Sequence, residues 1–272
     1  MESLMRGVTQ TLAITAAILT MTACSTTPAV PPLPALSGEN VTASMVAIPD
    51  LNLLTGDDVP LAATVVLSGK RTDKVILRIE GSTDGTSWST VEEVKAKGPT
   101  VELATHLVVS AAGPQQFRAS AVTADKKAKT IASSEPQAAT VFDLEQLVRT
   151  FYYDSTQSYG AGTQGGITFD EQHSYPNFAD FQSQAWKDQT AARLAANDIT
   201  ATVPSLTTLS PDPTWKLPAR SCSVAQTEPP AGRTYIVNVD STTTWNGFPT
   251  TGKYDVHVTF LNGQIYNWVN CG

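Results

Sequence analysis

The sequence is short of sulfur and histidine, and these shortages exclude several kinds of site. Only three cysteines occur in 272 residues, and none has the CxxC spacing that redox and zinc sites use. Only three histidines occur, and neither an HExxH nor a GxSxG motif is present. The sequence therefore predicts no metal site and no cofactor, and it contains no assembled catalytic motif.

Positive charge is also scarce. Lysine and arginine number 18 against 25 acidic residues, which leaves a net charge of −7. The one basic cluster, "DKKAKT" at 125–130, is typical of a solvated turn between strands. A nucleic-acid-binding protein needs a basic stripe to replace counterions on phosphate, so we expect no nucleic-acid partner.

Long apolar runs are missing except at the start of the chain. Residues 8–23 are apolar or threonine apart from Gln10, and they are too short and too diluted by threonine for a membrane-spanning helix, which needs about 20 apolar residues. The run follows the short segment "MESLMR", which carries Arg6. This pattern predicts a signal peptide over residues 1–23.

The run ends in Met21-Thr22-Ala23-Cys24, which resembles the lipobox of bacterial lipoproteins. The resemblance implies that the Cys24 thiol carries a diacylglyceryl group with fatty acids such as palmitate. It also implies an extracytoplasmic protein that is anchored by this lipid to the bacterial cell membrane. The alternative is that Cys24 is incidental, in an uncleaved helix or a plain signal peptide.

If Cys24 carries lipid, Cys222 and Cys271 remain as a pair in an oxidising compartment. An even set of cysteines there predicts a disulfide bond, and the alternative is two buried free thiols. Four prolines between Cys24 and Asn40 favour an extended path without a core, so we expect residues 24–40 to form a Pro-rich tether.

Residues 41–142 consist of short β-branched runs separated by turn signals. In "KVILRIE" at 74–80, for example, Val75, Leu77 and Ile79 alternate with Ile76, Arg78 and Glu80, as expected of a strand with one buried face. About seven strands in about 100 residues resemble an immunoglobulin-like or fibronectin type III sandwich. The segment "STDGTSW" at 82–88 resembles a shortened Asp-box, but a structural hairpin at Asp84-Gly85 is the simpler interpretation.

Residues 143–272 change to helical spacing. "DLEQLVRTFYYDS" predicts a helix with Asp143 as N-cap, and a second helix is predicted over Asn177–Asn197. Three strands follow, the last two joined by a turn at Asn262-Gly263. Two helices before a curved antiparallel sheet resemble the NTF2-like superfamily, so the expected fold is an all-β sandwich followed by an α+β domain.

Three groups of residues are candidates for a site. Asp255 and His257 share one face of a strand, and His173 lies near Asp170 and Glu171 in a loop; either group would serve as general acid and base, contribute to a metal site, or simply face solvent. Trp245, Tyr266 and Trp268 fill a core or line a pocket for an apolar or sugar ligand. "YGAGTQGG" matches GxGxxG but lacks a preceding strand, which favours a mobile glycine loop.

These observations lead to three hypotheses. The preferred one is a non-enzymatic envelope lipoprotein that binds an envelope protein or a small molecule. The second is an NTF2-like hydrolase, isomerase or dehydratase that uses Asp255 and His257, or His173. The third is an assembly factor for a surface complex.

Overall fold

The structure is a computed structural model. It describes residues 35–38, 41–68, 74–176, 180–185, 187–188, 191–192, 199–201, 205–220, 223–245 and 248–268. Cys24, Cys222 and Cys271 lie outside these residues, so the predictions for the lipid anchor and the disulfide bond stay predictions. Strands account for 52% of the structure and helical residues for 18%.

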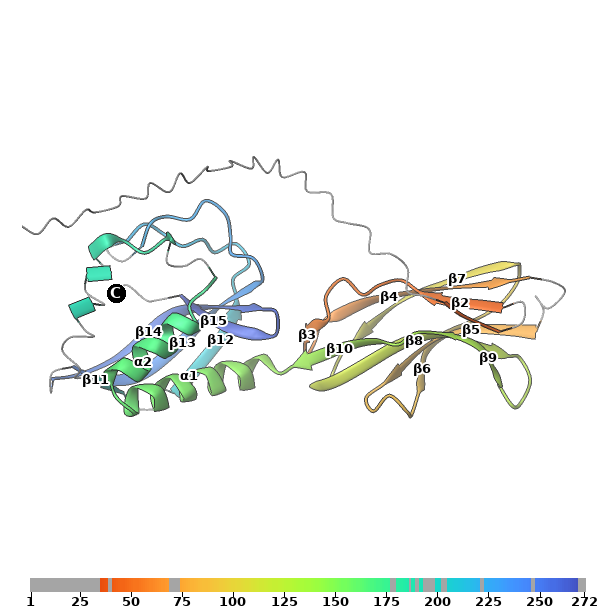
Figure 1. The fold of residues 1–272 in the computed structure, drawn as a ribbon, viewed down its shortest axis with the longest axis horizontal. Helices are drawn as coiled ribbons and strands as arrows, with labels where there is room; N and C mark the ends of the chain where they lie inside the picture. The colour runs from red at the N-terminus through yellow and green to blue at the C-terminus, as the bar shows by residue number, and fades with distance from the viewer. Residues whose placement is uncertain are drawn as a thin grey trace, which may run out of the picture. The chain divides into compact units, whose positions relative to one another are not determined.

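The first sheet contains ten strands (Figure 1). Their bounds are β1 Ala35–Gly38, β2 Val41–Met45, β3 Asn52–Leu54, β4 Asp58–Leu67, β5 Val75–Ser82, β6 Ser89–Lys95, β7 Thr100–Val108, β8 Gly113–Thr123, β9 Thr130–Ser134 and β10 Gln137–Phe142. The strand order is β3-β10-β8-β9-β1-β2-β4-β7, with β5 paired to β8 and β6 paired to β5.

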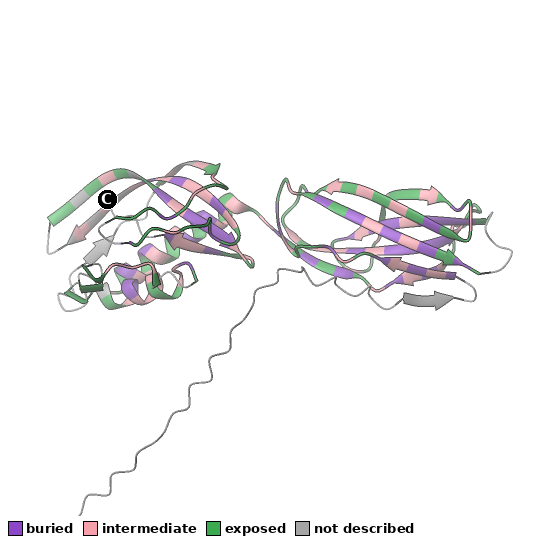
Figure 2. Cartoon of the chain, turned by 90° about the horizontal axis from the view of Figure 1, so that it is seen from above, coloured by how far each residue is buried: buried purple, intermediate pink, exposed green. Residues whose placement is uncertain are grey.

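Strand β1 connects two layers of this sheet, because it pairs with β9 at its start and with β2 at its end. Buried side chains alternate with more exposed ones along strands such as β4 and β10, and Figure 2 colours the strands by burial; the buried sets of the two layers form one core. Phe117, Leu77 and Val65 lie at its centre, each fully buried. Strand β1 begins at Ala35, inside the predicted tether of residues 24–40, and Ala35 and Leu36 pair with Ser134 and Ser133.

The second sheet contains five strands and follows two helices with defined bounds. These elements are α1 Leu144–Gly160, α2 Thr163–Gln172, β11 Ile199–Ala201, β12 Ser205–Pro211, β13 Arg233–Trp245, β14 Phe248–Leu261 and β15 Gln264–Trp268. The strand order is β11-β13-β14-β15, and β12 also pairs with β13. The turn between β14 and β15 is the predicted one, because Asn262 and Gly263 both adopt positive φ (53° and 79°).

Helix α1 begins where the sequence predicts. The Asp143 side chain accepts a hydrogen bond from the Gln146 backbone N–H, which satisfies a donor that the helix itself leaves unpaired. Val148 and Phe151 are buried on the sheet-facing side of α1. The apolar spacing therefore predicted this helix correctly.

The prediction of a mobile glycine loop at "YGAGTQGG" was wrong. Gly160 ends α1, Gly162 caps α2 with a φ of 121°, and Gly165 and Gly166 lie inside α2. A Cβ on Gly166 would lie 2.1 Å from the Tyr159 ring, so glycine here permits close packing of the two helices. The helix predicted over Asn177–Asn197 lies largely outside the described residues, and those described between 184 and 192 are helical.

The expected NTF2-like arrangement of helices on a sheet was also wrong, because the structure as a whole is mostly strand and its described residues form only two helices with defined bounds. Helix α2 has only ten residues, while β13 and β14 form a hairpin of 13 and 14 residues. Strands β11 and β12 were not predicted, because "ITA" and "SLTTLSP" are short and lack the apolar alternation that identifies a strand in sequence.

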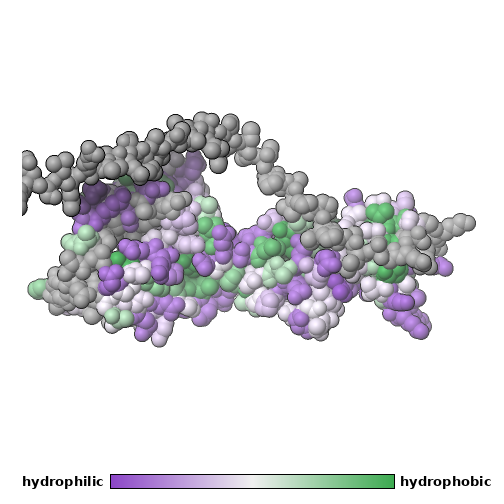
Figure 3. Space-filling model, viewed as in Figure 1, coloured by the Kyte–Doolittle hydropathy of each residue, from purple (hydrophilic) through white to green (hydrophobic). Residues whose placement is uncertain are grey.

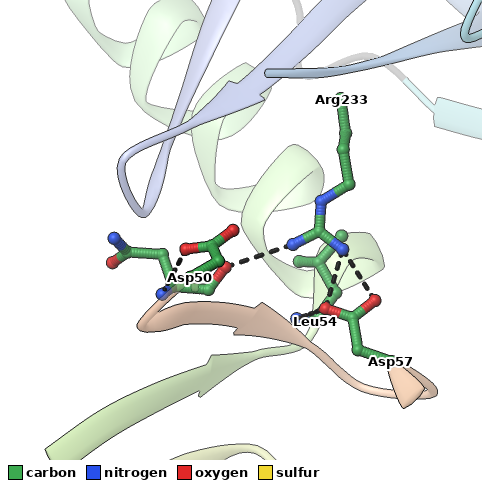
Figure 4. Close-up of polar contacts among 5 residues, drawn as sticks. Asp50, Leu54, Asp57 and Arg233 are labelled. Carbon is green, nitrogen blue, oxygen red and sulfur yellow. Dashed lines mark hydrogen bonds and ion pairs between the residues drawn. The ribbon is translucent and has the colours of Figure 1, made fainter. Parts of the chain in front are cut away.

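The two sheets meet at a polar contact between β13 and the end of β3 (Figure 4). The Arg233 guanidinium donates to both carboxylate oxygens of Asp57 at 2.6 and 2.7 Å, and to the Asn52 carbonyl at 3.1 Å. Asp57 also accepts the Leu54 N–H at 2.7 Å. Leu54 is buried in the core of the second sheet, so an apolar contact accompanies this ion pair.

Candidate functional site

The second sheet has two covered faces. On the helix side, Val256, Val258 and Phe260 of β14 are buried against Val148 and Phe151 of α1. On the opposite face, β14 and β15 present His257, Thr259 and Trp268. This second face is where the predicted candidates Asp255, His257, Tyr266 and Trp268 lie.

Aromatic side chains cover the second face. Trp268 is 1% exposed, and the Tyr175 ring stacks on it with centroids 4.3 Å apart. Trp215, from the irregular segment between β12 and β13, contacts Trp268 edge-on at 5.1 Å. Leu217 of the same segment is buried in this cluster. We call this group, with Phe181, Leu261 and Tyr266 at its border, the aromatic cluster.

The buried polar groups of this face are paired with one another. The Trp268 indole N–H donates to the Thr259 hydroxyl at 2.8 Å, and the Thr259 and Thr234 hydroxyls share a hydrogen bond of 3.0 Å. Thr259 is fully buried. Pairing of this kind removes the cost of burying a hydroxyl and an indole N–H, so it stabilises Trp268 as part of a core.

His257 of β14 packs against the segment between β12 and β13 that contains Asp212 and Trp215. Its ring stacks on Trp215 with centroids 4.3 Å apart, and its Nε2 lies 3.2 Å from the Asp212 carboxylate. Burial lowers the pKa of His257 below 6.5, and the Asp212 carboxylate opposes this shift only in part. The neutral imidazole is thus the form that the fold favours.

Asp255 is not the partner of His257, although both lie on the predicted face. Asp255 is exposed and accepts a hydrogen bond from the Asn238 side chain at 2.9 Å. The carboxylate that meets His257 is Asp212, which is 45 residues away in sequence. Since the His257 side chain is only 19% exposed and one ring face is covered, the structure favours a packing role for it over an acid–base role.

His173 lies at the end of α2, away from His257. Its ring stacks on Phe169 at 4.0 Å, and its Nδ1 lies 2.8 Å from the Phe169 carbonyl. The neighbouring Asp170 accepts a hydrogen bond from the Tyr159 hydroxyl. His173 is thus part of the packing between the helices and the sheet.

The aromatic candidates are separated by the fold. Trp268 is a core residue, whereas Tyr266 is partly exposed and its hydroxyl donates to Gln264 at 3.1 Å. The side chain of Trp245 lies outside the described residues. Trp245 is at the far end of the β13–β14 hairpin, paired with Phe248, so these three residues do not line one pocket.

The Asp-box-like segment is a self-contained loop between β5 and β6. The backbone N–H groups of Ser87 and Thr86 donate to the Asp84 carboxylate at 2.7 Å, and these bonds lower the pKa of Asp84. The Arg118 guanidinium lies 3.9 Å from the centre of the Trp88 ring. Both contacts stabilise the loop. A hairpin does join β5 and β6, but its loop spans residues 83–88 rather than the two predicted turn residues Asp84-Gly85.

Within the described part of the chain, no three or more His, Cys, Asp or Glu residues gather as a metal site would require. Among the same residues, no helix has the length and apolar character needed to span a membrane.

The main contacts that sequence reasoning missed come from Asp212, Trp215 and Tyr175. Asp212 and Trp215 belong to "SPDPTWKLP", where prolines hide any periodicity. A tryptophan inside a proline-rich connection was the available signal, because an indole is rarely left fully in solvent.

Comparison with known proteins gives little. No family description and no curated protein matches the sequence. Among solved structures, the β-glucosidase of Listeria innocua matches in its isofagomine complex with a TM-score of 0.28 at 11% identity, and in its glucose complex with 0.27 at 11% identity. Each match covers 37% of this chain and 16% of the other, so this chain spans about a sixth of that enzyme's length. Similarity at this level does not support an inference about fold or function.

Proposed function

We propose that the chain is an extracytoplasmic lipoprotein, anchored to the bacterial cell membrane through Cys24, that serves as a binding or interaction module. One observation carries the proposal: an apolar run ends in Met21-Thr22-Ala23-Cys24 and passes into a proline-rich stretch. In the described residues the folded part begins at Ala35, shortly after this stretch.

The number of acyl chains on a lipoprotein cysteine supports stable attachment to the membrane. One acyl chain binds a membrane only marginally and reversibly, whereas two chains on one cysteine anchor it stably. From Cys24 to Ala35 an extended proline-rich chain would span about 35 Å at about 3.1 Å per residue. The sheets would then be held close to the membrane surface but clear of it.

The side-chain environments favour a non-enzymatic role. Asp255 faces solvent, while His257 and His173 are occupied by packing contacts. An envelope protein or a small molecule remains the proposed ligand. We expect replacement of Asp255 and His257 by alanine to leave ligand binding intact.

The test is metabolic labelling with an alkyne-bearing fatty acid, followed by mass spectrometry of the N-terminal peptide. The wild-type chain should begin at a modified Cys24, and Cys24→Ser should lose both label and membrane association. Cys222→Ser is the control and should keep the label. An unmodified Cys24 thiol, or a retained leader peptide, would refute the proposal.

A further inference from the structure

Among the described strands, β7 forms an edge of the first sheet. It pairs with β4 on one side, and no other described strand pairs with it on the other side. Its nine residues pair with β4 without a register shift, and they include no proline. Such an edge presents a row of free N–H and C=O groups that can pair with another strand.

The opposite edge of the same fold has the usual protection. Strand β6 carries Glu92, Glu93 and Lys95, and its pairing with β5 is interrupted by a register shift. Charges and irregular pairing are devices that keep edges from associating. In β7 the ionisable residues are only Glu102 and His106, and its pairing with β4 has no register shift, so this edge has fewer of those devices than β6.

The hydrogen bonds next to β7 show which of its residues face the open edge. The Val109 N–H donates to the Asp57 carbonyl, and the Leu67 N–H donates to the Pro99 carbonyl. Because backbone groups alternate in direction along a strand, the odd-numbered residues of β7 bond to β4. The even-numbered residues, from Thr100 to Val108, therefore direct their N–H and C=O groups outward.

The same even-numbered residues have exposed side chains. Thr100, Glu102, Ala104, His106 and Val108 are all exposed, and the odd-numbered ones are buried or half-buried. Val66 of the neighbouring strand β4 is 47% exposed, and Val46, which follows β2 and bonds to Ala62 of β4, is 59% exposed. Val108 itself is 61% exposed. In the view of Figure 3, hydrophobic residues gather in small groups between hydrophilic ones.

We propose that β7 pairs antiparallel with β7 of a second copy of this chain, around a two-fold axis at Ala104. This register is set by the geometry: an axis at an even-numbered residue aligns the outward backbone groups of both copies, and Ala104 is the centre of the strand. All nine residues then overlap, and the five outward-facing residues of each copy form about ten hydrogen bonds.

This register also places a carboxylate opposite an imidazole, which can donate a hydrogen bond to it. Glu102 of one copy lies opposite His106 of the other, and the symmetry produces this pair twice. The His106 ring also lies 3.2 Å from the Asp58 carboxylate of its own chain. Thr100 lies opposite Val108, and Ala104 lies opposite itself. A second copy is thus the occupant that the edge fits best.

Cross-linking of the full chain in intact cells tests this pairing. Residues opposite each other in a hydrogen-bonded antiparallel pair have Cα atoms about 5.5 Å apart, which a disulfide can span. Ala104→Cys should give a cross-linked dimer whose linking peptide joins residue 104 to residue 104. Ala62→Cys is the matched control, because Ala62 pairs with Ala104 on β4 but would lie three strand spacings, about 14 Å, from its counterpart.

A charge reversal then tests the register. In the Ala104→Cys background, Glu102→Lys should weaken association about tenfold, since it places lysine opposite His106 twice. Glu92→Lys makes the same charge change on β6 and should leave the yield unchanged. The proposal is wrong if Ala104→Cys gives no 104–104 link, if Ala62→Cys cross-links equally well, or if Glu102→Lys has no effect. Because the test measures pairing and not lipid attachment, it is independent of the anchor at Cys24.

Discussion

The ion pair between Arg233 and Asp57 should measurably stabilise the contact between the two sheets. Arg233→Met keeps the alkyl stem, which packs near Phe260, but removes the guanidinium, which lies 5.1 Å from the centre of that ring. Asp57 would then keep only the Leu54 N–H. The two side chains are 33% and 26% exposed, so the carboxylate is largely removed from water.

The magnitude follows from this geometry. Hydrogen bonds to charged groups contribute about 1.5–3 kcal/mol each, and partial exposure places this pair at the lower end. We expect Arg233→Met to reduce the free energy of unfolding by about 2 kcal/mol. With a urea m-value near 2 kcal/mol/M, the unfolding midpoint should fall by about 1 M.

Urea unfolding followed by tryptophan fluorescence is a suitable assay, because Trp215 and Trp268 lie on the second sheet. Arg149→Met is the control, since Arg149 pairs with Glu145 on an exposed helix face and should lose only about 0.3–0.5 kcal/mol. A double-mutant cycle with Asp57→Asn isolates the pair. Equal shifts for both arginine variants, or strictly additive effects in the cycle, would refute the reasoning.

Three further predictions concern the second half of the chain. Gly166→Ala should lower the free energy of unfolding by about 2 kcal/mol, because the new Cβ would overlap the buried Tyr159 ring. Gly160→Ala is the control, because its Cβ would meet open space and the change should be neutral or stabilising. Thermal melts that shift in the same direction for both variants would count against this packing. Asp143→Ala should cost about 1 kcal/mol by removing the N-cap of α1, measurable by the same melts, and an unchanged melting temperature would contradict the cap. Because burial lowers the pKa of His257, the contribution of its neutral ring to stability should be present above pH 6.5 and be lost as pH falls through the folded-state pKa. Urea unfolding midpoints measured at several pH values should show this loss. His257→Gln should make the midpoint less dependent on pH.

Features with a local cause could be predicted from the sequence. The alternation of Val75, Leu77 and Ile79 predicted β5, and all three are buried. The cap at Asp143 and the turn at Asn262-Gly263 were also predicted correctly. Each depends on residues within a few positions of one another, so strand periodicity, side-chain capping and positive φ can be recognised without knowledge of the rest of the fold.

Features that join distant segments needed the tertiary structure. The partner of His257 proved to be Asp212 and not the nearby Asp255, because a segment without periodicity crosses the face of the sheet. The sequence predicted a loop at the glycines of α2, and only the structure shows that the Tyr159 ring occupies the space that a Cβ on Gly166 would fill.

The open edge of β7 illustrates the same division. The sequence by itself shows an alternating run with few charges, which is enough to predict a strand. Whether such a strand lies at the centre or the edge of a sheet depends on its neighbours, which are chosen by packing over the whole chain. Only the pairing of β7 with β4 decided which of its backbone groups face outward, since hydrogen-bond direction is set by register.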